Sequence, residues 1–264
     1  MIGVFDSGIG GLSILKALRA ELPHQGFIYV ADSGHAPYGE RDEAHVQARA
    51  RALTTHLAGR GVQALVVACN TATAAAIHLL RAEHPGLPIV GVEPALKPAV
   101  ALSPSGRIGV MATRGTLKSD KFQALLASLQ GQAEFVLQPC DGLALAIERS
   151  ADGQPATAQA LAEVSARHVQ ALDCAARGID TVVLGCTHYP LIRDLLAAQL
   201  GAVQLVDTGQ AVARQAARKL AESGGAASAE GALAFFCTGT RHTLEHAARR
   251  WISPEAQVQA LALP

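Results

Sequence analysis

The chain has 264 residues, of which half are hydrophobic and 17% are charged. That length suffices for about two domains of roughly 100–200 residues, and the hydrophobic content allows a large core. The 22 basic and 22 acidic residues give a formal net charge of zero, which disfavours nucleic acid and anionic membranes as main partners. Local basic patches stay open at Arg49/Arg51 and Arg249/Arg250.

Short apolar runs alternate along the chain with amphipathic stretches, which predicts a mainly parallel sheet structure with helices on both faces. We expect strands at Ile2–Phe5, Phe27–Ala31, Ala64–Ala68, Ile89–Val92, Arg107–Ala112, Glu134–Leu137, Thr181–Gly185, Gln204–Val206 and Ala234–Cys237. We expect helices at Leu12–Glu21, Glu43–Arg60, Thr71–Glu83, Thr116–Leu129, Thr157–Arg177 and Leu191–Leu200.

A weak internal repeat divides the chain. The segment that starts at Ile2 is similar to the one that starts at Ile108, and the surroundings of Cys69 are similar to those of Cys186. We therefore expect two similar α/β domains related by pseudo-twofold symmetry, with the active site in the cleft between them. The first would comprise residues 1–96 plus 208–264, and the second residues 97–207. The Gly/Ser/Ala tract Glu222–Gly231 predicts a flexible surface loop.

Two cysteines have matching local settings. Cys69 and Cys186 each follow an apolar strand and precede small polar residues and a helical pattern. A helix N-terminus favours a thiolate over a thiol, so we expect both cysteines to be placed for chemistry, one on each side of a site. A buried structural cysteine is the alternative for any one of them. That alternative also fits Cys140, Cys174 and Cys237.

The five cysteines are odd in number and widely spaced, which suits a reducing cytoplasm better than a disulfide framework. No Cys/His spacing is typical of a metal site. We expect no signal peptide, because the sequence opens directly with a strand, and no membrane span, because no apolar run reaches about 18–20 residues.

Four further segments could carry chemistry. The glycine-rich turn Asp6–Ser13 could bring backbone amides to an anion, although a plain strand-to-helix turn is the alternative. The loop Ala31–Gly39 contains Asp32 and Tyr38, and either side chain could face the cleft. His188 is close enough to Cys186 to tune its proton, and Glu148 ends an apolar run with a single carboxylate.

Five motifs together resemble glutamate racemase, of the aspartate/glutamate racemase family. They are Asp6-Ser-Gly-x-Gly-Gly11, Pro37-Tyr-Gly39, Cys69-Asn-Thr-Ala72, Gly91-Val-Glu-Pro-Ala95 and Gly185-Cys-Thr-His-Tyr-Pro190, in the order of the family. The resemblance implies two α/β domains and a cofactor-independent isomerase that interconverts L- and D-glutamate and supplies D-glutamate for peptidoglycan. It also implies a cytoplasmic protein, often a homodimer.

The resemblance implies a two-base 1,1-proton transfer, in which Cys69 attacks D-glutamate and Cys186 attacks L-glutamate. Asp6 and Asp32 would assist on the Cys69 side, and His188 and Glu148 on the Cys186 side. Substrate contacts would come from Asp6, Ser7, Pro37, Tyr38, Gly39, Asn70, Thr71, Thr113, Thr116, Thr187 and His188.

The sequence departs from the family pattern at Asp141-Gly142, where a proline-containing stretch is usual, which weakens the alignment of Glu148. Its short N-terminus resembles that of members without activation by a cell-wall precursor, so we expect none. Three alternatives stay open: a two-cysteine racemase for aspartate or hydantoins, a thiol-based metal or redox protein, and a pyridoxal-phosphate racemase. The last would need a Schiff-base lysine, and no lysine lies in a fitting motif.

Overall fold

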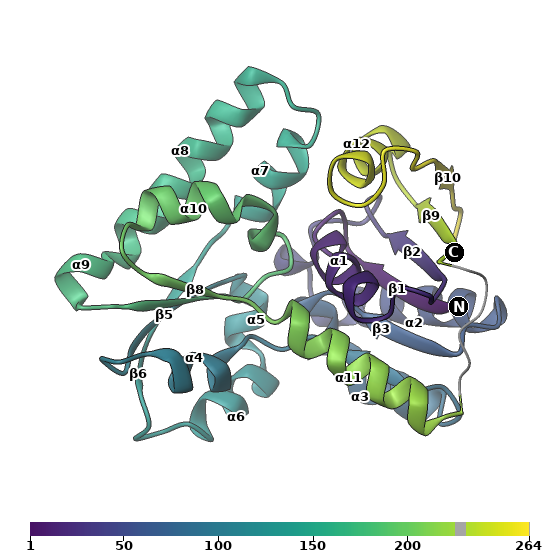
Figure 1. Cartoon of the computed structure of the whole chain (residues 1–264), viewed down its shortest axis with the longest axis horizontal. Helices are drawn as coiled ribbons and strands as arrows, with labels where there is room; N and C mark the ends of the chain where they lie inside the picture. Colours follow the sequence, from purple (N-terminus) through teal and green to yellow (C-terminus); the bar gives the residue numbers. More distant parts are fainter. Residues whose placement is uncertain (225–230, 264) are drawn as a thin grey trace.

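The computed structural model describes residues 1–224 and 231–263, and its strands form two parallel sheets that lie side by side (Figure 1). The six-stranded sheet has the order β10-β9-β2-β1-β3-β4, and the four-stranded sheet has the order β6-β5-β7-β8. The strands are β1 (Ile2–Asp6), β2 (Phe27–Ala31), β3 (Ala64–Val67), β4 (Ile89–Gly91), β5 (Arg107–Ala112), β6 (Glu134–Pro139), β7 (Thr181–Leu184), β8 (Gln204–Val206), β9 (Leu233–Cys237) and β10 (Val258–Ala260).

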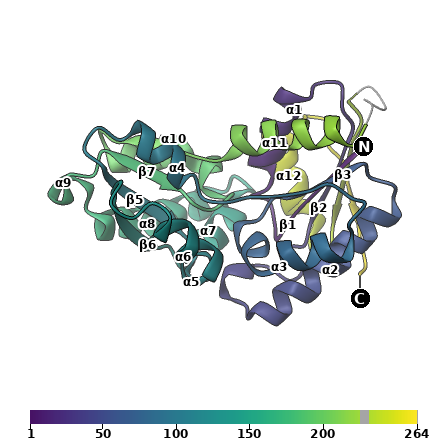
Figure 2. The same ribbon diagram turned by 90° about the horizontal axis from the view of Figure 1, so that it is seen from below.

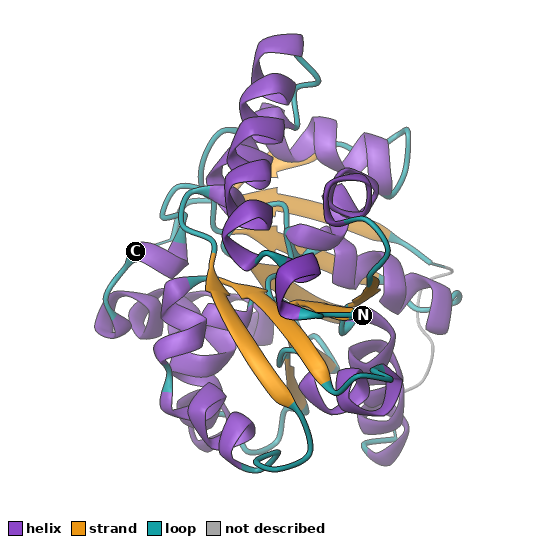
Figure 3. Ribbon diagram, turned by 90° about the vertical axis from the view of Figure 1, so that its left-hand side faces the viewer, coloured by secondary structure: helices purple, strands orange, loops and turns teal. Residues whose placement is uncertain are grey.

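Helices cover both faces of each sheet (Figure 3). The α-helices are α1 (Leu12–Glu21), α2 (Glu43–Gly59), α3 (Asn70–Glu83), α4 (Leu96–Leu102), α5 (Arg114–Lys118), α6 (Asp120–Ala127), α7 (Leu143–Ser150), α8 (Pro155–Leu172), α9 (Cys174–Arg177), α10 (Arg193–Leu200), α11 (Gly209–Glu222) and α12 (Arg241–Trp251). Two 3₁₀ helices, η1 (Tyr38–Glu40) and η2 (Tyr189–Ile192), follow β2 and β7 along the chain.

Alternating side chains along the strands build the core, because successive residues of a strand point to opposite faces. In β3, Val66 packs into a cluster with α1 and α11, whereas Leu65 and Val67 pack into a second cluster with α2 and α3. Figure 2 shows these two helix pairs on opposite sides of the six-stranded sheet. In β7, Val183 likewise packs with α4 and α6, on the face opposite Val182.

The internal repeat appears in the sheet topology. The order β2-β1-β3-β4 of the first unit matches β6-β5-β7-β8 of the second, so β1 corresponds to β5 and β3 to β7. Cys69 follows β3 and Cys186 follows β7, so the two cysteines occupy equivalent places. The expected pair of similar α/β units is therefore confirmed. The boundaries at 96/97 and 207/208 stay a prediction.

Several expected elements differ in detail. The helix expected over Thr116–Leu129 is two helices, and the one over Thr157–Arg177 is broken at Asp173, whose left-handed backbone (φ 46°) ends α8. Strand β10 and helices α4, α7, α11 and α12 were not expected. Of the tract Glu222–Gly231, residues 225–230 lie outside the described residues.

Candidate active site

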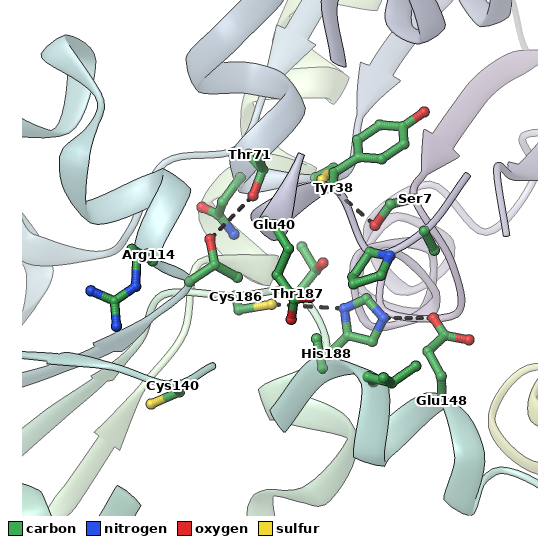
Figure 4. A pocket seen from close by; sticks show the side chains of 18 of the residues that line it. Ser7, Tyr38, Glu40, Thr71, Arg114, Cys140, Glu148, Cys186, Thr187 and His188 are labelled. Carbon is green, nitrogen blue, oxygen red and sulfur yellow. Dashed lines mark hydrogen bonds and ion pairs between the residues drawn. The ribbon is translucent and has the colours of Figure 1, made fainter. Parts of the chain in front are cut away.

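A cavity lies where the carboxyl ends of the two sheets approach one another, the usual place for a site in parallel α/β structures. Both units contribute to its wall (Figure 4). Of the residues expected from the sequence, it is lined by Asp6, Ser7, Pro37, Tyr38, Gly39, Cys69, Asn70, Thr71, Thr113, Glu148, Cys186, Thr187 and His188.

On the side of the first unit, Cys69 is the N-cap of α3, and its Sγ accepts a hydrogen bond from the Ala72 amide at 3.5 Å. Ser7 Oγ lies 4.0 Å from the same sulfur. Burial and the neighbouring carboxylate of Asp6 raise the pKa of Cys69 well above its usual value, even though the Ala72 amide opposes this shift. Burial thus outweighs the helix N-terminus and favours the thiol form of Cys69.

Asp6 ends β1 and is fully buried beside Cys69. Its Oδ2 accepts a hydrogen bond from the Gly11 amide at 2.6 Å, and burial raises the pKa of its carboxyl group. Within residues 1–224 and 231–263, Oδ1 of Asp6 has no hydrogen-bond partner. A buried oxygen without a partner at the wall of a cavity is suited to receive a ligand's donor.

On the side of the second unit, Cys186, His188 and Glu148 form a chain (Figure 4). Cys186 Sγ lies 3.7 Å from His188 Nδ1, and His188 Nε2 lies 2.7 Å from Glu148 Oε1. Burial by itself would lower the pKa of His188, but the hydrogen bonds to Cys186 and Glu148 raise it well above its usual value. These contacts favour the imidazolium form of His188, with a proton on each ring nitrogen, and an imidazolium can stabilise a thiolate on Cys186.

The local structure after Cys186 differs from the expected one. The 3₁₀ helix η2 begins at Tyr189, and α10 begins only at Arg193, so Cys186 is not the N-cap of an α-helix. The equivalence with Cys69 holds for the strand but not for the turn that follows it. A protonated histidine, instead of a helix N-terminus, supplies the positive charge beside Cys186.

Polar groups from both units lie around the two sulfurs. The hydroxyl of Thr71 lies 3.2 Å from that of Thr113, which in turn lies 3.0 Å from that of Thr116. Asn70 is buried at the cavity wall, and both polar atoms of its side chain lack a hydrogen-bond partner among the described residues. Such an amide is available to a bound carboxylate or ammonium group.

Two expected residues lie outside the cavity wall. Thr116 touches it only through the hydroxyls of Thr71 and Thr113. Asp32 is buried behind Tyr38, whose hydroxyl donates to its Oδ2 at 2.5 Å. Glu148, whose alignment was the weakest, lies in the wall on α7.

Sequence reasoning missed some residues of the wall. Arg114 and Asp141 form an ion pair with 2.5 Å between Nη2 and Oδ2, and Glu40 lies in the same wall. Cys140, interpreted as structural, also lines the cavity, and burial raises the pKa of its thiol. Their position in the sequence could have identified two of them. Cys140 directly follows the end of β6, and Arg114 is the second residue after the end of the neighbouring strand β5.

Residues 1–224 and 231–263 contain neither a cluster of metal ligands nor a membrane-spanning helix. No three His, Cys, Asp or Glu side chains come together in a way that could hold a metal ion. No helix in this part of the chain is long and apolar enough to cross a membrane.

Fold and site together define a two-unit α/β enzyme with a shared cavity, to which the first unit contributes Cys69 and the second contributes Cys186 and Cys140. Comparison with known proteins makes this specific: residues 12–216 match the family model described as Asp/Glu/Hydantoin racemase. The chain belongs to this racemase family, whose members are isomerases, and its similar relatives are glutamate racemases.

Two relatives and two solved structures show the extent of the similarity. The glutamate racemase of Ectopseudomonas mendocina is 50% identical over 84% of this chain and 82% of its own length, and that of Methylococcus capsulatus is 49% identical over 84% and 80%. The Escherichia coli glutamate racemase, solved with L-glutamate and the activator UDP-MurNAc-ala, is 33% identical with a TM-score of 0.89, covering 100% of this chain and 98% of that one. The Francisella tularensis glutamate racemase, solved with D-glutamate, is 26% identical with a TM-score of 0.82, covering 99% and 97%.

Proposed function

We propose that the protein interconverts L- and D-glutamate by a two-base 1,1-proton transfer between Cys69 and Cys186. The observation that carries this proposal is the unequal environment of the two sulfurs in one cavity. Burial favours the thiol form of Cys69, whereas the protonated His188 stands beside Cys186. One cysteine is thus prepared to accept a proton and the other to donate one.

In this resting state the enzyme is prepared for L-glutamate. The Cys186 thiolate removes the Cα proton from one face, and the Cys69 thiol delivers its own proton to the opposite face. The product is D-glutamate, with Cys186 now a thiol and Cys69 a thiolate, which is the state that attacks D-glutamate. A thiolate on Cys186 raises the pKa of Cys69. A negative charge on one sulfur therefore disfavours a negative charge on the other.

The Cα proton is a far weaker acid than a thiol, whose ordinary pKa is about 8.5, so the site must stabilise carbanion character. Hydrogen-bond donors fixed around the substrate carboxylate provide such stabilisation. Ser7, Asn70, Thr71 and Thr187 line the cavity on both sides and are suited to this task. The side-chain amide of Asn70 and Oδ1 of Asp6, which lack hydrogen-bond partners among the described residues, support binding of a carboxylate and an ammonium group.

A substrate panel tests this function. L-glutamate, D-glutamate, both aspartate enantiomers and a 5-substituted hydantoin are incubated separately without pyridoxal phosphate or added metal, and circular dichroism follows each signal. We expect the signal to decay to zero from both glutamate enantiomers and to persist for the other compounds. Decay of the signal with aspartate or hydantoin, but not with glutamate, would contradict the proposal and identify that compound as the substrate.

We further propose that the D-glutamate supplies peptidoglycan synthesis in the cytoplasm, and that the protein acts as a homodimer. The five free cysteines support a reducing compartment, and the glutamate racemase relatives support the pathway. Expression in a bacterium that requires external D-glutamate should restore growth without the supplement. Sedimentation velocity would test the dimer.

A further inference from the structure

Asp32 is enclosed by hydrogen-bond donors from three parts of the chain. It comes directly after β2 and is fully buried, and its side chain does not line the cavity. Arg49 donates to both of its carboxylate oxygens, at 3.0 Å from Nε and 3.1 Å from Nη2. Thr238, which follows β9, donates to Oδ1 at 2.8 Å, and Tyr38 donates to Oδ2. Both oxygens are therefore occupied.

These donors keep Asp32 ionised. Burial by itself would raise the pKa of its carboxyl group, but the hydrogen bonds from Arg49, Tyr38 and Thr238 lower it below its usual value. A general acid or base must reach the proton that it transfers, directly or through one water. Besides these donors, Nδ1 of the partly exposed His35 lies 3.2 Å from Oδ1. Asp32 has neither a free oxygen nor a place in the cavity wall, so it cannot reach a proton of a bound substrate directly.

Arg49 is an unusual residue for its place on α2. It lies in the buried stripe of that helix, with Val46, Ala50, Leu53 and Leu57, and its side chain is only 8% exposed. A guanidinium group bound through two nitrogens to one carboxylate has a fixed geometry. The neighbouring Arg51 pairs with Glu83 at the surface, so the two arginines do not form the basic patch that their spacing left open.

Tyr38 connects this ion pair to the cavity. Its side chain is 1% exposed and lies in the cavity wall, and Figure 4 shows its hydroxyl directed away from Cys186. That hydroxyl donates a hydrogen bond to Asp32 Oδ2. On its other side, Gly39 packs so closely against the second unit that an added Cβ would lie 2.8 Å from Thr113 Cβ. The segment 37–39 is thus fixed on one side by the hydrogen bond from Tyr38 to Asp32 and on the other by the contact of Gly39 with Thr113 of the second unit.

We propose that Arg49, Asp32 and Thr238 are positioning residues that hold Tyr38 and the segment 37–39 in place for substrate binding, and that Asp32 transfers no proton. The inference rests on the proposed function, because it concerns the same cavity. Its physical basis is that a displacement of about 1 Å in a group that contacts the substrate costs a large factor in efficiency.

The test compares Arg49→Gln with Arg51→Gln, a matched control two residues away on the same helix whose ion pair is exposed. We expect Arg49→Gln to raise KM for both enantiomers about tenfold, with kcat changed less than threefold and an unchanged pH profile of kcat. Arg49→Lys should recover part of the loss, and Arg51→Gln should behave as the wild type. Equal KM values for Arg49→Gln and Arg51→Gln would overturn the inference.

Two further variants keep the test decisive if Arg49→Gln folds poorly. Tyr38→Phe preserves the ring and the buried ion pair but removes the link between them, so KM should rise in the same way. Arg49→Gln should then add little in the Tyr38→Phe background, since both changes break one connection. An Asp32→Asn enzyme whose kcat profile loses an ionisation present in the wild type would instead show that Asp32 titrates during catalysis.

The inference and the proposed function fail in distinguishable ways. Wild-type turnover of glutamate is measured first, and its absence contradicts the proposed function alone. The effect of Arg49→Gln is expressed as the ratio of its KM to that of the wild type. The dissociation constant of glutamate, measured by calorimetry, is a second readout. We expect that constant to rise about tenfold in Arg49→Gln and to stay unchanged in Arg51→Gln.

Discussion

Glu148 and His188 meet at 2.7 Å between Oε1 and Nε2, and this contact holds the imidazole whose other nitrogen faces Cys186. The same oxygen of Glu148 accepts a hydrogen bond from the Ile9 amide, also at 2.7 Å. Ile9 belongs to the first unit and Glu148 to the second, so the carboxylate links the two units at the edge of the cavity. The carboxylate that positions His188 is therefore itself held by a backbone amide of the first unit.

Replacing Glu148 by glutamine should lower kcat/KM about a hundredfold. The carboxylate helps to raise the pKa of His188, so its removal lowers that pKa. His188 then loses its proton at a lower pH, and the alkaline limb of the pH–rate profile shifts toward neutrality. The profile of kcat/KM between pH 6 and 10 measures the shift, and an alkaline limb at its wild-type position would contradict this role of Glu148.

Serine at either sulfur should abolish racemisation. Cys69→Ser and Cys186→Ser each replace a thiol with a hydroxyl that is too weakly acidic to serve as the base, so we expect losses of about a thousandfold or more. Cys174→Ser is the control, because Cys174 is buried on α9 and does not line the cavity. It should retain full activity, and near-normal activity in either cavity variant would exclude the two-thiol mechanism.

Gly8 and Gly10 have no side chains, and this leaves room for the hydrogen-bonded side chains of His188 and Glu148. An alanine Cβ at Gly8 would overlap the carboxylate of Glu148, and one at Gly10 would overlap the ring of His188. Gly8→Ala should therefore reduce activity strongly with little change in the melting temperature, since the displaced group is the end of a flexible side chain. Gly59→Ala is the matched control, because no atom of the described residues lies within 4 Å of the added Cβ, and it should leave both quantities unchanged.

The buried ion pair of Asp32 and Arg49 should make the free energy of unfolding depend on pH in the acid range. The folded-state pKa of Asp32 is below its usual 3.8, so its stabilising effect is complete above pH 3.8 and is lost as the pH falls through the folded-state value. Asp32→Asn should lower the free energy of unfolding by about 3–5 kcal/mol at pH 6, because Arg49 is left buried without a counter-charge. Urea unfolding should show this difference narrowing below pH 3.8, and a constant difference down to pH 2.5 would contradict it.

The sequence pattern identified most strands because each is a short apolar run, and it located both cysteines because each follows one. It missed β10, whose three residues Val258–Ala260 form an edge strand with two exposed side chains. It also missed α12, where Leu244, Ala247 and Ala248 provide a short buried stripe among charged residues. These elements form through tertiary contacts that local composition does not reveal.

The candidate site shows the same limit. The motifs placed Cys69, Asn70, Cys186 and His188 at strand ends, and the cavity has them in its wall. They gave no information on which charges surround each sulfur, because those charges come from segments far apart in the chain. Arg49 is the clearest case: a charged residue within a buried stripe predicts a buried partner, but only the fold identifies that partner as Asp32.

The most direct test of the two-cysteine account is the fate of the Cα hydrogen during turnover in D₂O. Each glutamate enantiomer is incubated separately, and NMR measures Cα deuterium in both the product and the remaining substrate at early times. The account predicts deuterium in nearly all newly formed product and protium in the remaining substrate, from either direction, because the acid and the base are different groups. Product that retains the substrate's own hydrogen, or deuterium entering substrate and product equally, would contradict it.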